Sequence, residues 1–117
     1  MVGLVVVSHS RALARAAVAL AEQMLTSRRP PIQIAAGTGE TTFGTDAPAI
    51  AAAITLADLD SGGDGVVVLT DLGSAVLSTD LALELLDDST RARVALSAGP
   101  LVEGLVVAAV TAATGAA

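Results

Sequence analysis

The residue best suited to covalent chemistry is the only histidine, His9, at the centre of the sequence SHS that follows apolar residues 2–7. Sixty residues further on, a second apolar run, residues 66–70, leads into the sequence DLGS, which begins at Asp71. An imidazole can take a covalent group on one ring nitrogen while a carboxylate holds the other. The spacing therefore suggests a histidine-centred site, provided that the fold brings His9 and Asp71 together.

Strand-length apolar runs alternate with longer segments of helical period, which is typical of β-α units on a parallel sheet. We expect strands at residues 2–7, 32–36, 66–70 and 94–98, with a helix after each. Right-handed crossovers leave few topologies for four such units. The prediction is an α/β fold: a single doubly wound domain over residues 1–117, with a mainly parallel four-stranded sheet of order 2-1-3-4 and helices on both faces.

In this strand order the first and third strands lie side by side, and the switch point falls between them. His9 and Asp71 follow these two strands, so we expect both at one crevice. Each has a structural alternative, because His9 could serve only as a hydrogen-bonding cap and Asp71 could cap the third helix. In the functional interpretation Asp71 accepts the His9 Nδ1–H, which fixes the tautomer and leaves Nε2 nucleophilic.

Helical periodicity assigns apolar faces to the helices. In the first helix the predicted stripe is made of Leu13, Ala16, Ala17, Leu20 and Met24, and in the third helix Leu77, Leu81 and Leu85 share one face. The last helix, residues 101–114, is apolar nearly all round. Because such a helix is normally buried on more than one side, we expect it to form a homodimer contact.

Composition excludes several classes of protein. The net charge is −6 and the six basic residues are all arginine, so no basic face is available for nucleic acid. There is no cysteine and a single histidine, so we expect neither a metal nor another cofactor. No signal peptide precedes the first strand, and the longest apolar stretch, residues 105–117, is too short to span a bilayer. We therefore expect a cytoplasmic protein without a membrane contact.

Other residues near the two strand ends could bind an anion. Gly73 and Ser74 start a helix, where free backbone N–H groups suit a phosphate dianion. Ser10 could bind phosphate or cap the first helix, and Arg11 and Arg15 could contact phosphate or simply face solvent.

Two alternative chemistries fit poorly. A Ser-His-Asp hydrolase would need a nucleophile elbow, G-x-S-x-G, which the sequence lacks. A response-regulator receiver would need acidic metal ligands after the first strand and a later lysine, and the chain has no lysine. The remaining hypothesis is that His9 carries a phosphoryl group. Phosphoryl transfer requires mainly that the protein positions the reacting groups and neutralises their charge.

Four segments resemble a known family. Their sequences are VVVSHS at residues 5–10, GTD at 44–46, DLGSA at 71–75 and GPLVEG at 99–104. Together they resemble the DhaM family, the phosphotransferase subunits of dihydroxyacetone kinases that depend on the phosphoenolpyruvate phosphotransferase system (PTS). The wider group has the mannose-type enzyme IIA fold.

The resemblance implies a phosphotransferase in which His9 receives a phosphoryl group from the phosphocarrier HPr. His9 would pass it to ADP on the nucleotide-binding subunit of dihydroxyacetone kinase. By the same resemblance Asp71 orients His9, while Gly73, Ser74 and the loop at Gly44 and Thr45 line the phosphate pocket. Homodimers are typical of the fold, and a separate donor protein is expected because the sequence holds no further carrier domain. The alternatives are an enzyme IIA domain of a mannose-type sugar transporter and a regulatory module that partners recognise by His9 phosphorylation.

Overall fold

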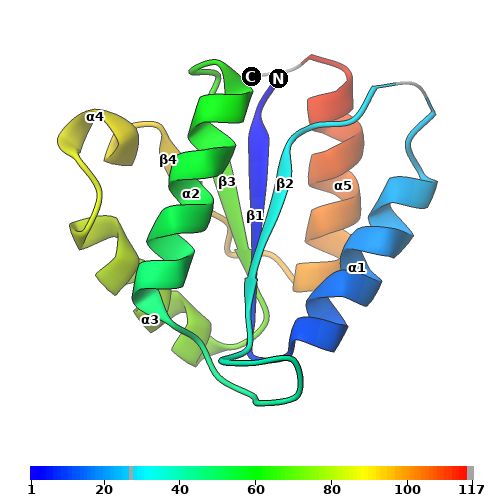
Figure 1. The fold of residues 1–117 in the computed structure, drawn as a ribbon. Coiled ribbons are helices and arrows are strands. Elements are labelled where there is room, and N and C mark those ends of the chain that lie inside the picture. The colour runs from blue at the N-terminus through cyan, green and yellow to red at the C-terminus, as the bar shows by residue number, and fades with distance from the viewer. Residues whose placement is uncertain (27, 116–117) are drawn as a thin grey trace.

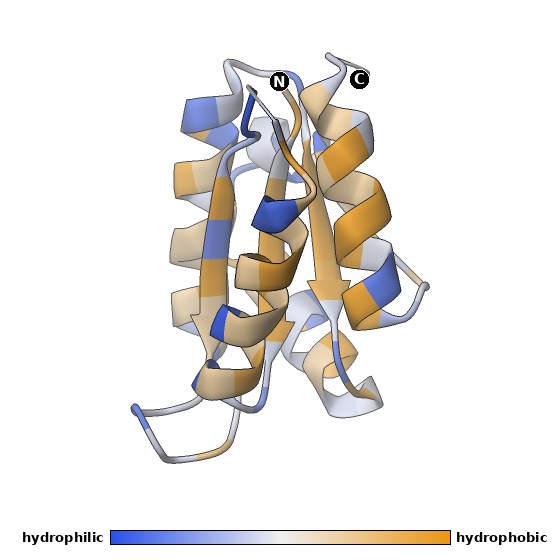
Figure 2. Cartoon of the chain, turned by 90° about the vertical axis from the view of Figure 1, so that its right-hand side faces the viewer, coloured by the Kyte–Doolittle hydropathy of each residue, from blue (hydrophilic) through white to orange (hydrophobic). Residues whose placement is uncertain are grey.

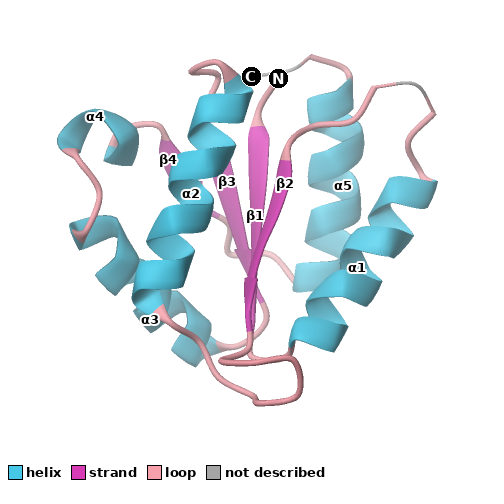
Figure 3. Ribbon diagram, viewed as in Figure 1, coloured by secondary structure: helices cyan, strands magenta, loops and turns pink. Residues whose placement is uncertain are grey.

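The fold is a parallel sheet between two layers of helices (Figures 1 and 3). The computed structural model describes residues 1–26 and 28–115. The strand order is β2-β1-β3-β4, as predicted, and all three strand pairs are parallel. The strands are β1 (Gly3–Ser8), β2 (Ile32–Ala36), β3 (Val66–Thr70) and β4 (Val94–Leu96). The helices in the described residues are α1 (Arg11–Gln23), α2 (Ala47–Ser61), α3 (Gly73–Glu84), α4 (Asp88–Arg91) and α5 (Leu101–Ala113).

Helices α2 and α3 cover one face of the sheet, and α1 and α5 cover the other (Figure 1). The six residues of β1 are all buried because this central strand has helices on both faces. Val5 and Val7 belong to the core beneath α2 and α3, whereas Leu4 and Val6 belong to the core beneath α1 and α5. In Figure 2 the strands are mostly orange, the colour of hydrophobic residues. These two cores hold the ends of β1 and β3, and hence the residues that follow them, in place.

Helix α2 approaches β1 very closely at Gly3. A Cβ atom built on Gly3 would lie 2.8 Å from the carbonyl oxygen of Ala57 in α2. Glycine at this position therefore permits a helix–strand separation that any other residue would increase.

The predicted buried face of α1 was wrong in part. Ala14, Ala17 and Ala21 face the core, while Leu13 and Leu20 are exposed. Only small side chains fit where α1 packs on β1 and β2 and against α5, so alanines rather than leucines occupy the interface. Leucine spacing alone therefore indicated a face that the tight packing does not use.

The second half of the chain differs from the prediction in two details. The short helix α4 was not predicted, and β4 ends at Leu96 rather than at residue 98. Helix α5 buries one side against the sheet and contacts α1, yet Val107 stays exposed. In the described residues, no helix has the length and apolar character needed to cross a membrane.

Candidate functional site

The fold places His9 and Asp71 side by side. Strands β1 and β3 are parallel neighbours, and Val7 pairs with Thr70 in their register. His9 follows the end of β1 and Asp71 follows the end of β3, so both lie at the carboxyl edge of the sheet. The Asp71 N–H donates to the carbonyl oxygen of Val7 at 3.2 Å, which continues the ladder by one bond. A backbone hydrogen bond thus holds the two chain segments together next to these residues, which are 62 apart in sequence.

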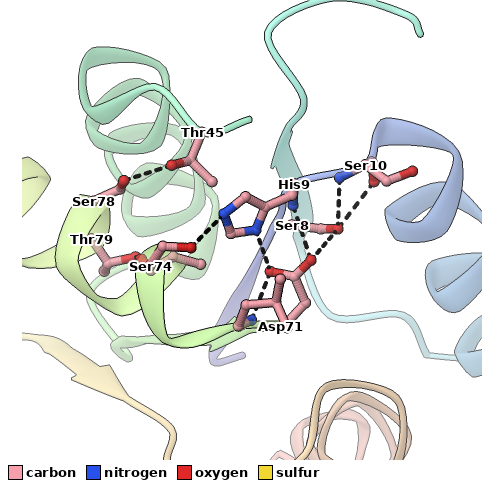
Figure 4. A network of polar contacts seen from close by, with 10 residues as sticks. Ser8, His9, Ser10, Thr45, Asp71, Ser74, Ser78 and Thr79 are labelled. Atoms are coloured by element: carbon pink, nitrogen blue, oxygen red, sulfur yellow. Dashed lines mark hydrogen bonds and ion pairs between the residues drawn. The ribbon is translucent and has the colours of Figure 1, made fainter. Parts of the chain in front are cut away.

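Four hydrogen-bond donors converge on the Asp71 carboxylate (Figure 4). Its Oδ1 lies 3.0 Å from His9 Nδ1 and accepts the Leu72 N–H at 2.8 Å. Its Oδ2 accepts the His9 backbone N–H at 3.0 Å and the hydroxyl of the fully buried Ser8 at 2.9 Å. Four donors nearly saturate a carboxylate, so its position and its orientation are both fixed.

The charge of Asp71 sets the tautomer of His9. Burial acts to raise the pKa of the Asp71 carboxyl, but hydrogen bonds from the His9 N–H, the His9 ring and the Ser8 hydroxyl together hold this pKa below its ordinary value. The carboxylate is therefore ionised at neutral pH and can only accept hydrogen bonds. Nδ1 must then carry the proton, and in the neutral ring Nε2 keeps its lone pair.

Ser74 lies on the other side of the imidazole. Its Oγ is 2.6 Å from His9 Nε2, so in the neutral ring the hydroxyl donates to this nitrogen. Ser74 and Gly73 occupy the first turn of α3, where backbone N–H groups have no partner within the helix. The His9 side chain retains 24% exposure and that of Asp71 only 10%. Nε2 thus faces an exposed, hydroxyl-lined helix start, with the carboxylate behind the ring.

The loop between β2 and α2 borders the same ring. The Gly44 N–H donates to the His9 carbonyl oxygen at 2.8 Å, so this N–H is already engaged. The Thr45 and Ser78 hydroxyls lie 2.5 Å apart and connect the loop to α3 beside the imidazole (Figure 4). Ser78 was not among the predicted site residues, although its position one turn after Ser74 places both hydroxyls on the same side of α3.

The side chains of three other predicted residues are engaged by groups other than the imidazole. Ser10 is the N-cap of α1, and its hydroxyl accepts the Leu13 N–H at 3.2 Å instead of contacting the ring. The Ser10 hydroxyl therefore caps α1 in this structure, as the structural alternative predicted. Arg11 and Arg15 form salt bridges with Glu40 at 3.2 and 2.7 Å, which fasten the loop to α1.

The site is a surface feature rather than a deep pocket. Three clefts of about 330, 450 and 210 Å³ open elsewhere on the molecule, and none of the three is lined by His9 or Asp71. Within residues 1–26 and 28–115, no three His, Cys, Asp or Glu side chains are grouped so that they could hold a metal ion. A part-exposed imidazole that a carboxylate holds from behind suits a reaction partner that is itself a protein surface.

Comparison with known proteins identifies the family. The family model described as PTS system fructose IIA component, EIIA-man, matches residues 3–117. The chain belongs to the EIIA-man family. A solved crystal structure of a protein of unknown function superposes with a TM-score of 0.79 at 34% identity, covering 95% of this chain and 82% of that one.

Two curated relatives of this chain are phosphoryl donor subunits of dihydroxyacetone kinases. The phosphoryl donor subunit DhaM of the PEP-dependent dihydroxyacetone kinase of Escherichia coli (strain K12) is 48% identical over 119 residues. That alignment covers 99% of this chain but 24% of the E. coli protein, so the chain spans about a quarter of its length. The phosphoryl donor subunit DhaM of the PEP-dependent dihydroxyacetone kinase 2 of Listeria innocua is 34% identical, over 94% of this chain and 85% of that protein.

Proposed function

We propose that the chain is the phosphoryl donor subunit of a PTS-dependent dihydroxyacetone kinase and carries the phosphoryl group on His9 Nε2. The observation that carries the proposal is the Asp71–His9 contact, which leaves Nε2 unprotonated on the exposed side of the ring. The names of the E. coli and L. innocua relatives support the kinase assignment. Residues 1–117 would form one EIIA-man domain.

In the loading step the Nε2 lone pair attacks the phosphorus of a phosphorylated donor, for which we propose HPr. The new N–P bond forms as the bond between phosphorus and the donor atom that carried it breaks, and that donor atom keeps the electron pair. The Nδ1 proton stays between His9 and Asp71, so the carboxylate balances the positive charge that develops on the ring. The chain needs to supply little beyond this positioning.

The phosphoryl oxygens would be held mainly by the start of α3. On phosphorylation the Ser74 hydroxyl no longer donates to Nε2 and turns to a phosphoryl oxygen, while the Gly73 and Ser74 N–H groups offer further donors. Thr45 lies beside the ring and could add its hydroxyl, whereas Gly44 acts by holding the loop to His9. Ser10 would contribute only through the helix that it caps.

In the unloading step the phosphoryl group passes to ADP held by the nucleotide-binding subunit of the kinase. The β-phosphate oxygen of ADP forms the new bond to phosphorus, and the N–P bond to His9 breaks. His9 then returns to its neutral, Ser74-bonded state. We also propose a homodimer, formed through the exposed side of α5 around Val107.

A sugar transporter is the second candidate function. The description of the matching family model, PTS system fructose IIA component, favours an enzyme IIA domain that passes its phosphoryl group to a sugar-transport component. Both functions share the loading step, so they differ only in the acceptor.

One experiment separates the candidates. The chain is incubated with radiolabelled phosphoenolpyruvate, enzyme I and HPr, and the label is located by mass spectrometry. The two remaining kinase subunits, ADP and dihydroxyacetone are then added. We expect label on His9 and its transfer through ADP to dihydroxyacetone, which yields labelled dihydroxyacetone phosphate. Label that stays on His9 in the presence of the complete kinase would refute the kinase assignment, and label on another residue would refute the mechanism.

A further inference from the structure

Helix α3 carries a row of exposed leucines that the proposed chemistry does not use. The row consists of Leu77 and Leu81 within the helix and Leu85 at its C-cap; these residues, called here the leucine stripe, are 67%, 58% and 60% exposed. The opposite side of α3 is buried through Ala75, Thr79 and Ala82 and fully accounts for the packing of the helix on the sheet. Single exposed leucines need no explanation, but three in line on one helix indicate an interaction surface.

The leucine stripe leads directly to the reactive nitrogen. Residues advance by about 100° around an α-helix, so Leu81 and Leu85 lie within about 20° of Ser74 in rotation, and Leu77 lies about 60° to one side. Ser74 is the residue whose hydroxyl contacts His9 Nε2. With a rise of about 1.5 Å per residue, the stripe extends some 16 Å along α3 from that contact. A partner that covers the stripe is therefore positioned over the imidazole.

The charges beside the leucine stripe are acidic. Asp80 and Glu84 are exposed on α3, and this helix contains no basic residue. The basic residues nearest to His9 in sequence, Arg11 and Arg15, are both paired with Glu40. The negative phosphoryl group therefore approaches a surface that is itself acidic along α3. Basic residues that balance these negative charges must come from the protein that delivers the phosphoryl group.

We infer that the leucine stripe, together with Asp80 and Glu84, is the docking surface for the phosphoryl donor protein, which presents an apolar patch bordered by basic residues. This inference rests on the proposed function. The unphosphorylated chain is the form that meets a donor, and in it Nε2 contacts Ser74, which lies nearly in line with the stripe. A second copy of this chain fits less well, because it would bring its own Asp80 and Glu84 against these acids and cover Nε2.

The test measures phosphoryl transfer from phosphorylated HPr to three leucine-to-alanine variants. Leu77→Ala and Leu81→Ala shorten the stripe, and Leu59→Ala is the matched control because Leu59 is 71% exposed on α2. We expect kcat/KM to fall about tenfold for each stripe variant and to stay within twofold of wild type for the control. Labelling of His9 by phosphoramidate, a small donor that needs no docking, should be unchanged in all three.

A charge variant gives an independent measurement. Glu84→Lys should reduce kcat/KM for HPr at low ionic strength, and the difference from wild type should shrink as salt is added, because screening weakens steering between exposed charges. An equal rate for Glu84→Lys and wild type at low salt would refute the electrostatic part of the inference.

Failure of the inference is distinct from failure of the proposed function. If HPr labels His9 of wild type and of the stripe variants at equal rates, the docking surface is wrong while the function stands. If phosphoramidate labels the wild type but HPr does not, the proposed donor and the docking surface both fail. A stripe variant that changes from dimer to monomer in sedimentation, with HPr transfer unchanged, would assign the stripe to self-association and overturn the inference.

Discussion

Replacing Asp71 by asparagine tests how the site holds its nucleophile. The carboxylate accepts four hydrogen bonds, from the His9 ring, the His9 N–H, Ser8 and Leu72. An amide has one oxygen to accept with, so two arrangements are open to Asp71→Asn. If its NH₂ group faces Nδ1, the ring proton moves to Nε2 and the nucleophile is lost. If its oxygen faces Nδ1, the NH₂ group points at the His9 N–H and the Ser8 hydroxyl.

The magnitude follows from the lost charge. A hydrogen bond to a charged group contributes about 1.5–3 kcal/mol, and Asp71 makes this contact to a ring that becomes cationic on phosphorylation. Its removal should slow loading by roughly 10- to 150-fold at 25 °C. Transfer should be slowed rather than abolished, because the nucleophilic ring is still present.

The assay is rapid-quench labelling by phosphorylated HPr under single-turnover conditions. Asp60→Asn is a matched control, since it makes the same change at an exposed position of α2. Nitrogen NMR of the ring reports the tautomer independently, with Nδ1 protonated in the wild type. A loading rate in Asp71→Asn equal to that of wild type, with the tautomer unchanged, would refute the role given to the carboxylate.

Three further outcomes are expected. His9→Ala should abolish labelling yet lower the free energy of unfolding by only about 1.5–3 kcal/mol in a urea titration, because the contact with Asp71 is lost but the imidazole is part-exposed and outside the core; global unfolding would instead make His9 structural. Gly3→Ala should destabilise the fold by about 1–3 kcal/mol, since its Cβ would press on the Ala57 carbonyl oxygen, and an unchanged melting temperature would contradict that close approach. The pKa of Asp71 is lower in the folded chain, so its ionised form stabilises the fold above its ordinary pKa of 3.8, and this contribution is lost as pH falls through the folded value. The stability advantage of wild type over Asp71→Asn should therefore shrink between pH 7 and pH 3, and a constant difference in urea titrations would argue against this coupling.

The sequence predicted the framework of the site better than its details. The apolar runs before His9 and Asp71, together with the handedness of β-α crossovers, were enough to place both residues at one edge of the sheet. The contact of Ser74 with Nε2 depends on where α3 begins and how it tilts, which periodicity does not give. The Ser8 hydroxyl could not be assigned to Asp71 because side-chain direction at a strand end depends on the local backbone.

Apolar spacing indicates the packing face of a helix well only where large side chains are buried. In α2 the branched residues Ile50 and Ile54 lie at helical spacing and do face the core. In α1 and α3 alanine and threonine are buried while leucines face solvent. Hydrophobicity alone therefore predicts that the wrong residues of these helices are buried. Close helix–sheet contact selects for small volume, and a pattern that weighs only apolar character overlooks this requirement.

The amino terminus and the end of α5 both lie at the edge of the sheet opposite His9 (Figure 1). Six residues of β1 separate that edge from the imidazole, a distance of about 20 Å at the usual strand rise. In any longer polypeptide that contains this domain, a neighbouring module joined at either end begins on the far side of the molecule. A tethered carrier would need a connecting segment long enough to reach around a helix layer, whereas a carrier arriving from solution finds the reactive edge unobstructed by the attachment points.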